Sequence, residues 1–220
     1  MESELLTPTM HMDHSQPDYR PDYIVWRITE TEDELKAALQ HPDYYADKVQ
    51  NLKPGSRRLL EVLAVRRALK ELYDGEEQRV LYTADGKPYL EDGRYRISIS
   101  HTQGYATVIR SEAGCPGIDI ERLGNRVERV VGQFLKPEEN LLLQLSGGDY
   151  RTALHLAWSA KETAYKVLGH DYYDLKTLTS VMHVDWQGKC LYLSVKGHET
   201  AMQIHFCLHS DYVLTWTVDP

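Results

Sequence analysis

Two acidic side chains, Asp119 and Glu121, stand two residues apart in a short apolar segment. If that segment is a strand, side-chain alternation places both carboxylates on one face. Neighbouring carboxylates repel each other, and a cation close to both relieves the repulsion. Two solvated acids at a strand end are the plainer interpretation, and for this pair alone we favour it.

A second group of residues that could take part in catalysis or binding lies about forty positions later. Trp158, Glu162 and Lys166 are spaced by four, so on a helix they share one stripe, and Lys161 lies beside it. A surface ion pair next to a core tryptophan would also explain this stripe. If Glu162 joined the two acids above, three carboxylates would form an oxygen site of the type that magnesium prefers. A lysine beside such a site suits a phosphate group or a proton transfer.

Basic and hydroxyl side chains gather in the first half of the chain. Gly86-Lys87-Pro88 places a lysine on a rigid turn, and a strand-like segment carries Ser98 and Ser100 on one face before His101. Arg57 opens a helical pattern, where free backbone N–H groups favour anions. Together these residues suit several phosphates. Taken singly, a turn, a structural histidine and a solvated arginine face are equally good explanations.

Hydrophobic periodicity predicts the elements that hold these residues. We expect a helix capped by Thr31, a long helix from Arg57, a helix opened by Pro137, and a long helix from Arg151 that ends before Gly169. Strands are expected at 23–28, 79–83, 95–100, 105–109, 117–121, 178–186, 191–195, 202–208 and 213–218. Each half therefore runs from helix to several strands, which suggests a duplicated α+β unit.

Composition limits the classes of function. The chain has 220 residues, 42% of them apolar and 26% charged, as in average soluble globular proteins. Its formal net charge of -8 argues against a nucleic-acid partner. We find no apolar run of membrane-helix length and no secretory signal, so we expect no membrane partner. The scattered Cys115, Cys190 and Cys207 fit reduced thiols, and we expect a cytoplasmic protein.

The ordered motifs resemble those of a known family. Gly117-Ile118-Asp119-Ile120-Glu121, followed by Trp158-Ser159-Ala160-Lys161-Glu162 and then Lys166, is similar to the signature pair of the 4'-phosphopantetheinyl transferase superfamily. Gly86-Lys87-Pro88 and Ile97-Ser98-Ile99-Ser100-His101 resemble its two upstream motifs. Each motif alone is weak, but the ordered set is specific. The length resembles the longer, pseudo-dimeric branch typified by the surfactin synthetase activator.

This resemblance implies a fold and an activity. The fold would be α+β, with two similar halves related by a pseudo-two-fold axis and coenzyme A bound between them. We expect a mobile N-terminal tail at residues 1–22, a first half at 23–116 and a second half at 117–220 that carries the metal acids. The activity would be transfer of 4'-phosphopantetheine from coenzyme A to a serine of an apo acyl or peptidyl carrier protein, with release of 3',5'-ADP. A monomer is expected, with a role of the type found in fatty acid biosynthesis.

The resemblance also implies residue roles. Asp119, Glu121 and Glu162 match the family's Mg²⁺ ligands, Lys166 matches the lysine near the reacting phosphates, and Glu162 is the candidate base. The residues expected around coenzyme A are Arg57, Gly86, Lys87, Pro88, Ser98, Ser100, His101, Asp119 and Lys161, with Lys48 as a further basic candidate. An arginine-rich segment, Arg122, Arg126 and Arg129, is expected to meet the acidic carrier, although a solvated segment would look the same.

Two other functions remain open at this point. One is a non-catalytic module of the same fold that binds coenzyme A or a nucleotide. The other is a different magnesium phosphotransferase, or a nuclease, built on the same acids. Dependence of the activity on coenzyme A would distinguish these functions.

Overall fold

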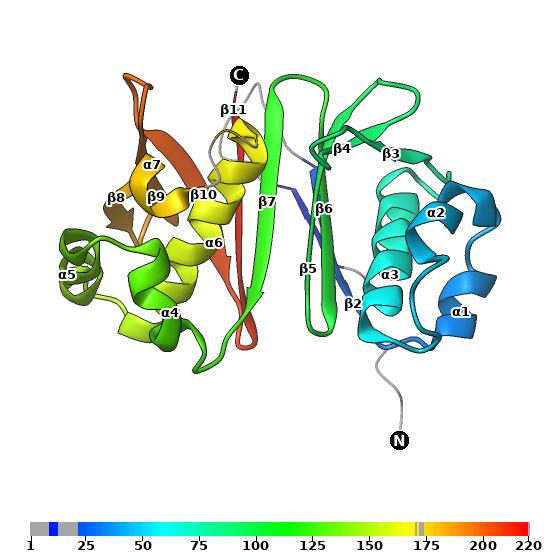
Figure 1. Cartoon of the computed structure of the whole chain (residues 1–220), viewed down its shortest axis with the longest axis horizontal. Coiled ribbons are helices and arrows are strands. Elements are labelled where there is room, and N and C mark those ends of the chain that lie inside the picture. Colours follow the sequence, from blue (N-terminus) through cyan, green and yellow to red (C-terminus); the bar gives the residue numbers. More distant parts are fainter. Residues whose placement is uncertain (1–8, 13–21, 170, 172–173, 220) are drawn as a thin grey trace. The chain divides into compact units, whose positions relative to one another are not determined.

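The computed structural model describes residues 9–12, 22–169, 171 and 174–219 (Figure 1). The chain divides into two compact units, Met1–Ala113 and Gly114–Pro220. The sequence analysis expected the boundary at Gly117, and the observed boundary lies three residues earlier. The reason is that the acid-bearing strand β7 (Cys115–Arg122) already begins at Cys115. In the described part of the chain, no helix combines the length and the apolar character that a membrane span requires.

The first unit is an antiparallel sheet covered by one long helix (Figure 1). Its strand order is β1-β2-β6-β5, and the strands are β1 (Thr9–Met12), β2 (Asp22–Arg27), β5 (Arg96–Thr102) and β6 (Tyr105–Ser111). Helix α3 (Arg57–Leu72) packs on this sheet because its small and apolar residues, among them Ala64 and Val65, share one buried cluster with Ile97 and Val108. A separate ribbon is formed by β3 (Val80–Tyr82) and β4 (Pro88–Leu90).

Strand β1 corrects one expectation. Residues 1–22 were expected to form a mobile tail, yet Thr9–Met12 pair with β2 in a register that runs from Thr9 opposite Val25 to Met12 opposite Asp22. Backbone hydrogen bonding along that register accounts for an ordered segment that side-chain composition did not predict. The other residues of the expected tail, apart from Asp22, lie outside the described part.

Short helices precede α3, and their caps confirm the sequence signals. These are α1 (Glu32–Ala37), the 3₁₀ turn η1 (Pro42–Tyr44) and α2 (Ala46–Val49). Thr31 and Glu34 form the predicted capping box: the Thr31 N–H donates to Glu34 Oε2 at 2.8 Å and the Glu34 N–H donates to Thr31 Oγ1 at 3.3 Å. Ser56 caps α3 by accepting from the Leu59 N–H at 3.3 Å.

The second unit is a five-stranded antiparallel sheet in the order β7-β11-β10-β9-β8. The remaining strands are β8 (Thr179–Asp185), β9 (Cys190–Val195), β10 (Met202–Leu208) and β11 (Tyr212–Asp219). Its helices are α4 (Val127–Phe134), α5 (Pro137–Leu145), α6 (Tyr150–Leu168) and α7 (Leu175–Leu178). Helices and antiparallel sheets in both units confirm a mixed α+β chain. As expected, Pro137 begins α5 and Gly169, at φ 92°, ends α6.

Helix α6 lies unusually close to β7 at Gly117. A Cβ atom at this position would stand 2.5 Å from the Thr163 carbonyl oxygen and 2.7 Å from Val167 Cγ2. A buried hydroxyl cluster fastens the same helix to β11, since Thr215 Oγ1 is 2.8 Å from Ser159 Oγ and 2.6 Å from Thr163 Oγ1. These contacts fix the register between the helix and the strands that carry the site residues.

Candidate functional site

The acidic residues of β7 share one strand face, as the alternation in the sequence predicted, and this face meets helix α6. Gly117, Asp119 and Glu121 share the strand face that meets the helix, while Ile118 and Ile120 are fully buried on the other face. The stripe of α6 therefore lies opposite the two acids. The helix runs antiparallel to the strand here, because Trp158 meets Glu121 and Lys166, two turns later, meets Asp119.

Two hydrogen bonds hold these acids. Lys166 Nζ donates to Asp119 Oδ1 and to the carbonyl oxygen of Ile118, both at 2.8 Å. Trp158 Nε1 donates to Glu121 Oε1 at 2.9 Å, and the indole ring packs edge-on against Phe134 of α4. An ammonium group is thus already placed beside the carboxylates, where it can stabilise additional negative charge.

The three carboxyl groups influence one another electrostatically. The pKa of Glu121 is raised to about 7, chiefly by burial and then by the charges of Asp119 and Glu162, while the Trp158 hydrogen bond and the charge of Lys166 oppose the shift. Burial, followed by the charge of Asp119, also raises the pKa of Glu162. Glu162 therefore lies in the same low-dielectric environment as the two strand acids. The spacing in the sequence had not decided whether these three residues are close to one another.

This donor set fits a hard divalent cation by its chemistry. Three carboxylates that disfavour one another's ionisation gain from a positive ion, and magnesium prefers oxygen ligands. Within the residues that the structure describes, no three His, Cys, Asp or Glu side chains are already gathered closely enough to hold a metal ion. Asp119 and Glu121 are instead held by Lys166 and Trp158.

A histidine of α6 holds the loop that follows the acidic strand. His155 is buried, and its Nε2 lies 3.0 Å from the Gly124 nitrogen and 2.9 Å from the Gly124 carbonyl oxygen. Burial lowers the pKa of His155. The imidazole thereby ties the end of β7 to the helix that carries Glu162.

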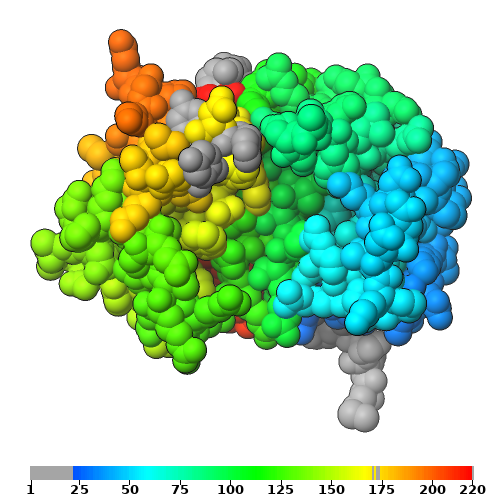
Figure 2. Space-filling model, in the orientation of Figure 1, coloured from blue at the N-terminus to red at the C-terminus, as the bar shows by residue number. Residues whose placement is uncertain are grey.

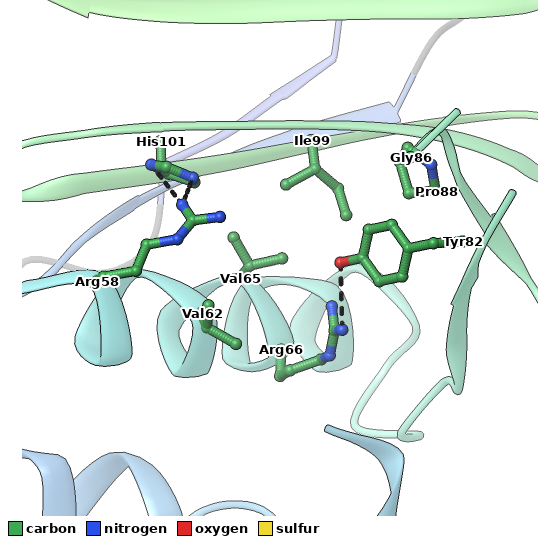
Figure 3. Close-up of a pocket in the computed structure, with 9 residues that line it drawn as sticks. All are labelled: Arg58, Val62, Val65, Arg66, Tyr82, Gly86, Pro88, Ile99 and His101. Atoms are coloured by element: carbon green, nitrogen blue, oxygen red, sulfur yellow. Dashed lines mark hydrogen bonds between the residues drawn. The ribbon is translucent and has the colours of Figure 1, made fainter. Parts of the chain in front are cut away.

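The first unit contains a pocket of about 170 Å³ between α3 and the β3–β5 region (Figure 3). It is lined by Arg58, Val62, Val65, Arg66, Tyr82, Gly86, Pro88, Ile99 and His101. Arg58 contacts the His101 ring (Figure 3). The Nδ1 atom of that ring lies 3.1 Å from Glu61 Oε2. Glu61 is buried, and burial raises its pKa although Arg57 and Arg58 oppose the shift.

A family model decides where part of this chain belongs. The model for the 4'-phosphopantetheinyl transferase superfamily, abbreviated ACPS, matches residues 116–217, which include both β7 and α6. This segment, which makes up most of the second unit, belongs to the 4'-phosphopantetheinyl transferase superfamily. No curated protein matches the chain at a significant level. The matched segment contains every acid of the candidate site and also Lys166, so superfamily membership and the acidic geometry rest on the same part of the chain.

One residue expected near coenzyme A lies in the protein interior instead. Lys161 was expected near coenzyme A, but its side chain is fully buried and pairs with Glu139 at 2.7 Å. Its Nζ also donates to the carbonyl oxygens of Phe134 at 2.9 Å and Thr179 at 3.2 Å. Because these acceptors come from α4, α5 and the start of β8, Lys161 fastens α6 to its neighbours.

The first-unit residues that the family resemblance implied are only partly brought together. Gly86, Pro88 and His101 line the pocket. Ser98 and Ser100 alternate with the pocket-lining Ile99 and His101, so they lie on the opposite face of β5. Arg57 is exposed and pairs with Glu61 at 3.3 Å, and Lys87 is absent from the residues that line this pocket.

Sequence reasoning missed several residues of both sites. Arg58, Arg66, Tyr82 and Glu61 were given no role, nor was the Trp158 contact with Glu121. The available signal for Glu61 was an acid within a run of helical arginines, at i+4 from Arg57 and i+3 from Arg58. No local pattern pointed to Tyr82, since it reaches the pocket from another element.

Proposed function

We propose that the protein transfers the 4'-phosphopantetheine group of coenzyme A to a serine hydroxyl of an apo acyl or peptidyl carrier protein. The observation that carries this proposal is the placement of Asp119, Glu121 and Glu162 together with Lys166, inside the segment that matches the superfamily. Membership supports phosphopantetheinyl transfer in general. The coenzyme A donor, the metal and the carrier are parts of the proposal.

The proposed metal is magnesium, held by Asp119, Glu121 and Glu162. When bound, it would supply positive charge to the diphosphate oxygens, on which negative charge accumulates during phosphoryl transfer. Lys166 already donates to Asp119 at 2.8 Å, so its ammonium group lies beside the same carboxylates. Its proposed task is to stabilise the developing charge of the diphosphate through direct hydrogen bonds.

The proposed reaction is a displacement at phosphorus. The carrier serine Oγ forms a bond to the phosphorus that bears the pantetheine arm, and the bond from this phosphorus to the bridging oxygen breaks. The electron pair leaves with 3',5'-ADP. The serine proton passes to the carboxylate of Glu162, whose pKa is raised by burial and by Asp119, which makes this group a better proton acceptor than an ordinary glutamate.

We assign the nucleotide part of coenzyme A to the first unit. The pocket there combines an apolar floor with arginine side chains, and its volume of about 170 Å³ suits one part of the molecule. His101, Gly86 and Pro88 are proposed to contact the nucleotide from within it. Arg57, Lys87, Ser98 and Ser100 remain proposed ligands that lie outside this pocket.

The proposed carrier surface is the arginine-rich start of α4. Arg122, Arg126 and Arg129 are exposed to solvent. Side chains of α4 and α5 (light green) lie on the face of the molecule that Figure 2 shows. An acidic carrier would find positive charge here although the whole chain carries -8.

Intact mass spectrometry of the carrier tests the proposal. Purified protein, coenzyme A, Mg²⁺ and an apo carrier from a panel of acyl and peptidyl carriers would be mixed, with a parallel reaction that contains chelator. A mass gain of one phosphopantetheine, absent with chelator, is the expected result. Coenzyme A binding without any gain on the whole panel would favour the non-catalytic binding module. Neither binding nor gain would overturn the proposed function.

A further inference from the structure

A short loop, residues 123–126, joins the acid-bearing strand β7 to helix α4. It begins two residues after Glu121, Arg122 directly precedes it, and Arg126 is its last residue. Most of the loop is exposed to solvent. The position of this loop therefore sets where two arginines of the proposed carrier surface stand relative to the acids.

His155 of α6 holds the middle of this loop. The residue is 5% exposed, and its Nε2 atom lies 3.0 Å from the backbone nitrogen of Gly124 and 2.9 Å from the backbone oxygen of the same residue. A ring whose Nε2 carries no proton accepts a hydrogen bond from the Gly124 N–H, and a ring with a proton on Nε2 donates to the Gly124 carbonyl oxygen. The imidazole can therefore hold Gly124 in every protonation state.

Other contacts hold the two ends of the loop. At its start, the Leu123 N–H donates to the Asp211 carbonyl oxygen at 2.8 Å, and directly after it Val127 is buried in the core of the second unit. The stretch between these anchors contains Gly124 and Asn125, residue types that allow the backbone many conformations. The His155 contact divides this stretch and so limits the conformations that it can adopt.

Stability alone does not require a histidine at this position. Gly124 is exposed, so water could satisfy its N–H and C=O groups without the imidazole. Burial lowers the pKa of His155, and its neighbours in the helix, Leu154 and Leu156, are fully buried. An apolar side chain would fill such a site without the cost of desolvating a polar ring. What the imidazole adds is a fixed place for the loop backbone.

We propose that His155 is a positioning residue for the carrier protein. By holding Gly124, it places Arg122 and Arg126 where an acidic carrier meets them while the carrier serine reaches the acids. This inference rests on the proposed function, and it assigns part of the carrier affinity to a buried residue beneath the carrier surface. A loop that is ordered in advance does not have to be ordered on binding, so association loses less conformational entropy.

Steady-state kinetics of the full chain in the carrier mass assay test this role. His155→Phe cannot bond to Gly124 and should raise the KM for the carrier about 3- to 10-fold, while kcat and the Kd of coenzyme A stay within about 2-fold. His155→Gln offers both a donor and an acceptor and should return the KM to within about 2-fold of the wild type. His155→Met covers the case in which the phenylalanine variant does not fold, and the same rise in KM is expected.

A double-mutant cycle shows whether His155 acts through the arginines. In a protein that carries Arg122→Gln and Arg126→Gln, His155→Phe should raise the KM for the carrier no further, because the loop has lost the charges that it positions. The same fold rise in both backgrounds would overturn the proposal. A double-glutamine protein with the KM of the wild type would overturn it as well.

Trp186→Phe is the matched control for a general loosening of the second unit. Trp186 also holds a backbone group through one ring nitrogen, since its Nε1 donates to the Ser146 carbonyl oxygen at 2.8 Å. This variant should lower the Tm and leave the KM for the carrier unchanged. If His155→Phe changes the KM no more than Trp186→Phe does, His155 is structural and the proposal ends. Absence of transfer by the wild type would instead count against the proposed function.

Discussion

At the level of single residues, burial and mutual repulsion of the carboxylates destabilise the ionised forms of the acidic site. Glu121 and Glu162 both have raised pKa values because they are buried near other carboxylates. In the absence of a cation, their ionised forms oppose folding. A site that is costly in the free protein and useful with a bound ligand is typical of functional residues.

Glu162→Gln should separate stability from activity. The amide cannot accept the serine proton and is a poorer metal ligand, so turnover in the carrier mass assay should fall by at least about 100-fold, as for loss of a general base. Calorimetry should still detect coenzyme A binding. In chelator, the Tm should be unchanged or higher, because one buried negative charge is removed. Glu199→Gln, an exposed position, serves as the control, and full activity of Glu162→Gln would contradict the assignment.

The His155 contact predicts a pH dependence of stability. Its folded-state pKa is lowered from 6.5, chiefly by burial, so the folded protein holds this proton less tightly than the unfolded chain does. The stabilisation is fully present above pH 6.5 and is lost as the pH falls through the lower folded-state pKa. The difference in unfolding free energy between wild type and His155→Phe should therefore be larger at pH 8 than at pH 5 in urea titrations. An equal difference at both pH values would refute this role.

The sequence could predict the parts of the site that depend on one element at a time. Alternation placed Asp119 and Glu121 on one face, and helical spacing placed Glu162 and Lys166 on one stripe. Lys161 was misjudged because only the packing of three other elements shows that its side chain turns into the interior. Local periodicity carries no information on such distant acceptors.

At the level of elements, the contact between β7 and α6 decides the geometry of the site. The absence of a side chain at Gly117 lets the helix backbone approach the strand, and the Thr215 hydroxyl cluster holds the helix on the next strand. The helix could not lie this close to the acids if the strand carried a larger residue at this point.

Gly117→Ala should therefore be destabilising. The added Cβ would meet the Thr163 carbonyl oxygen at 2.5 Å, so the helix has to shift, at an expected cost of about 1–3 kcal/mol. A lower Tm and a slower transfer reaction should appear together. Gly132→Ala is the control, because Gly132 lies in α4 with nothing within 4 Å, and there alanine should stabilise the helix. Equal Tm changes in the two variants would show that the close approach is unimportant.

Element prediction succeeded where sequence signals were local and failed where they were not. The capping box at Thr31 and the glycine after α6 were identified correctly. Helix α4 was missed because its charged residues hid a stripe of Val127, Val130, Val131 and Phe134. Strand β1 was missed because its pairing with β2 is a backbone interaction, which leaves little trace in composition.

At the level of the whole molecule, positively charged side chains gather locally although the net charge of the chain is negative. A chain with a net charge of -8 exposes three arginines between the acidic strand and the middle of α4, and collects cations around the pocket of its first unit. Recognition of anionic partners by this protein therefore has to be local, because the net charge of the chain repels them.

Charge reversal tests the carrier surface. Replacement of Arg122, Arg126 and Arg129 by glutamate should raise the KM for the carrier by about 10-fold or more, while the Kd of coenzyme A stays within about 2-fold. The same replacement at Arg79, Arg94 and Arg96, which are exposed in the first unit, controls for net charge. If both triple variants behave alike in carrier kinetics at the same ionic strength, the α4 surface has no special role.

The hydrogen bond between Trp158 and Glu121 also makes the protein optically informative. The indole N–H points at a carboxylate whose pKa is about 7, so a change in that charge alters the electric field across the chromophore. Replacement of Trp26, Trp186 and Trp216 by phenylalanine would leave Trp158, at the acidic site, as the single tryptophan fluorophore. Its emission maximum would then report protonation and cation binding directly, without an added dye and before any substrate is turned over.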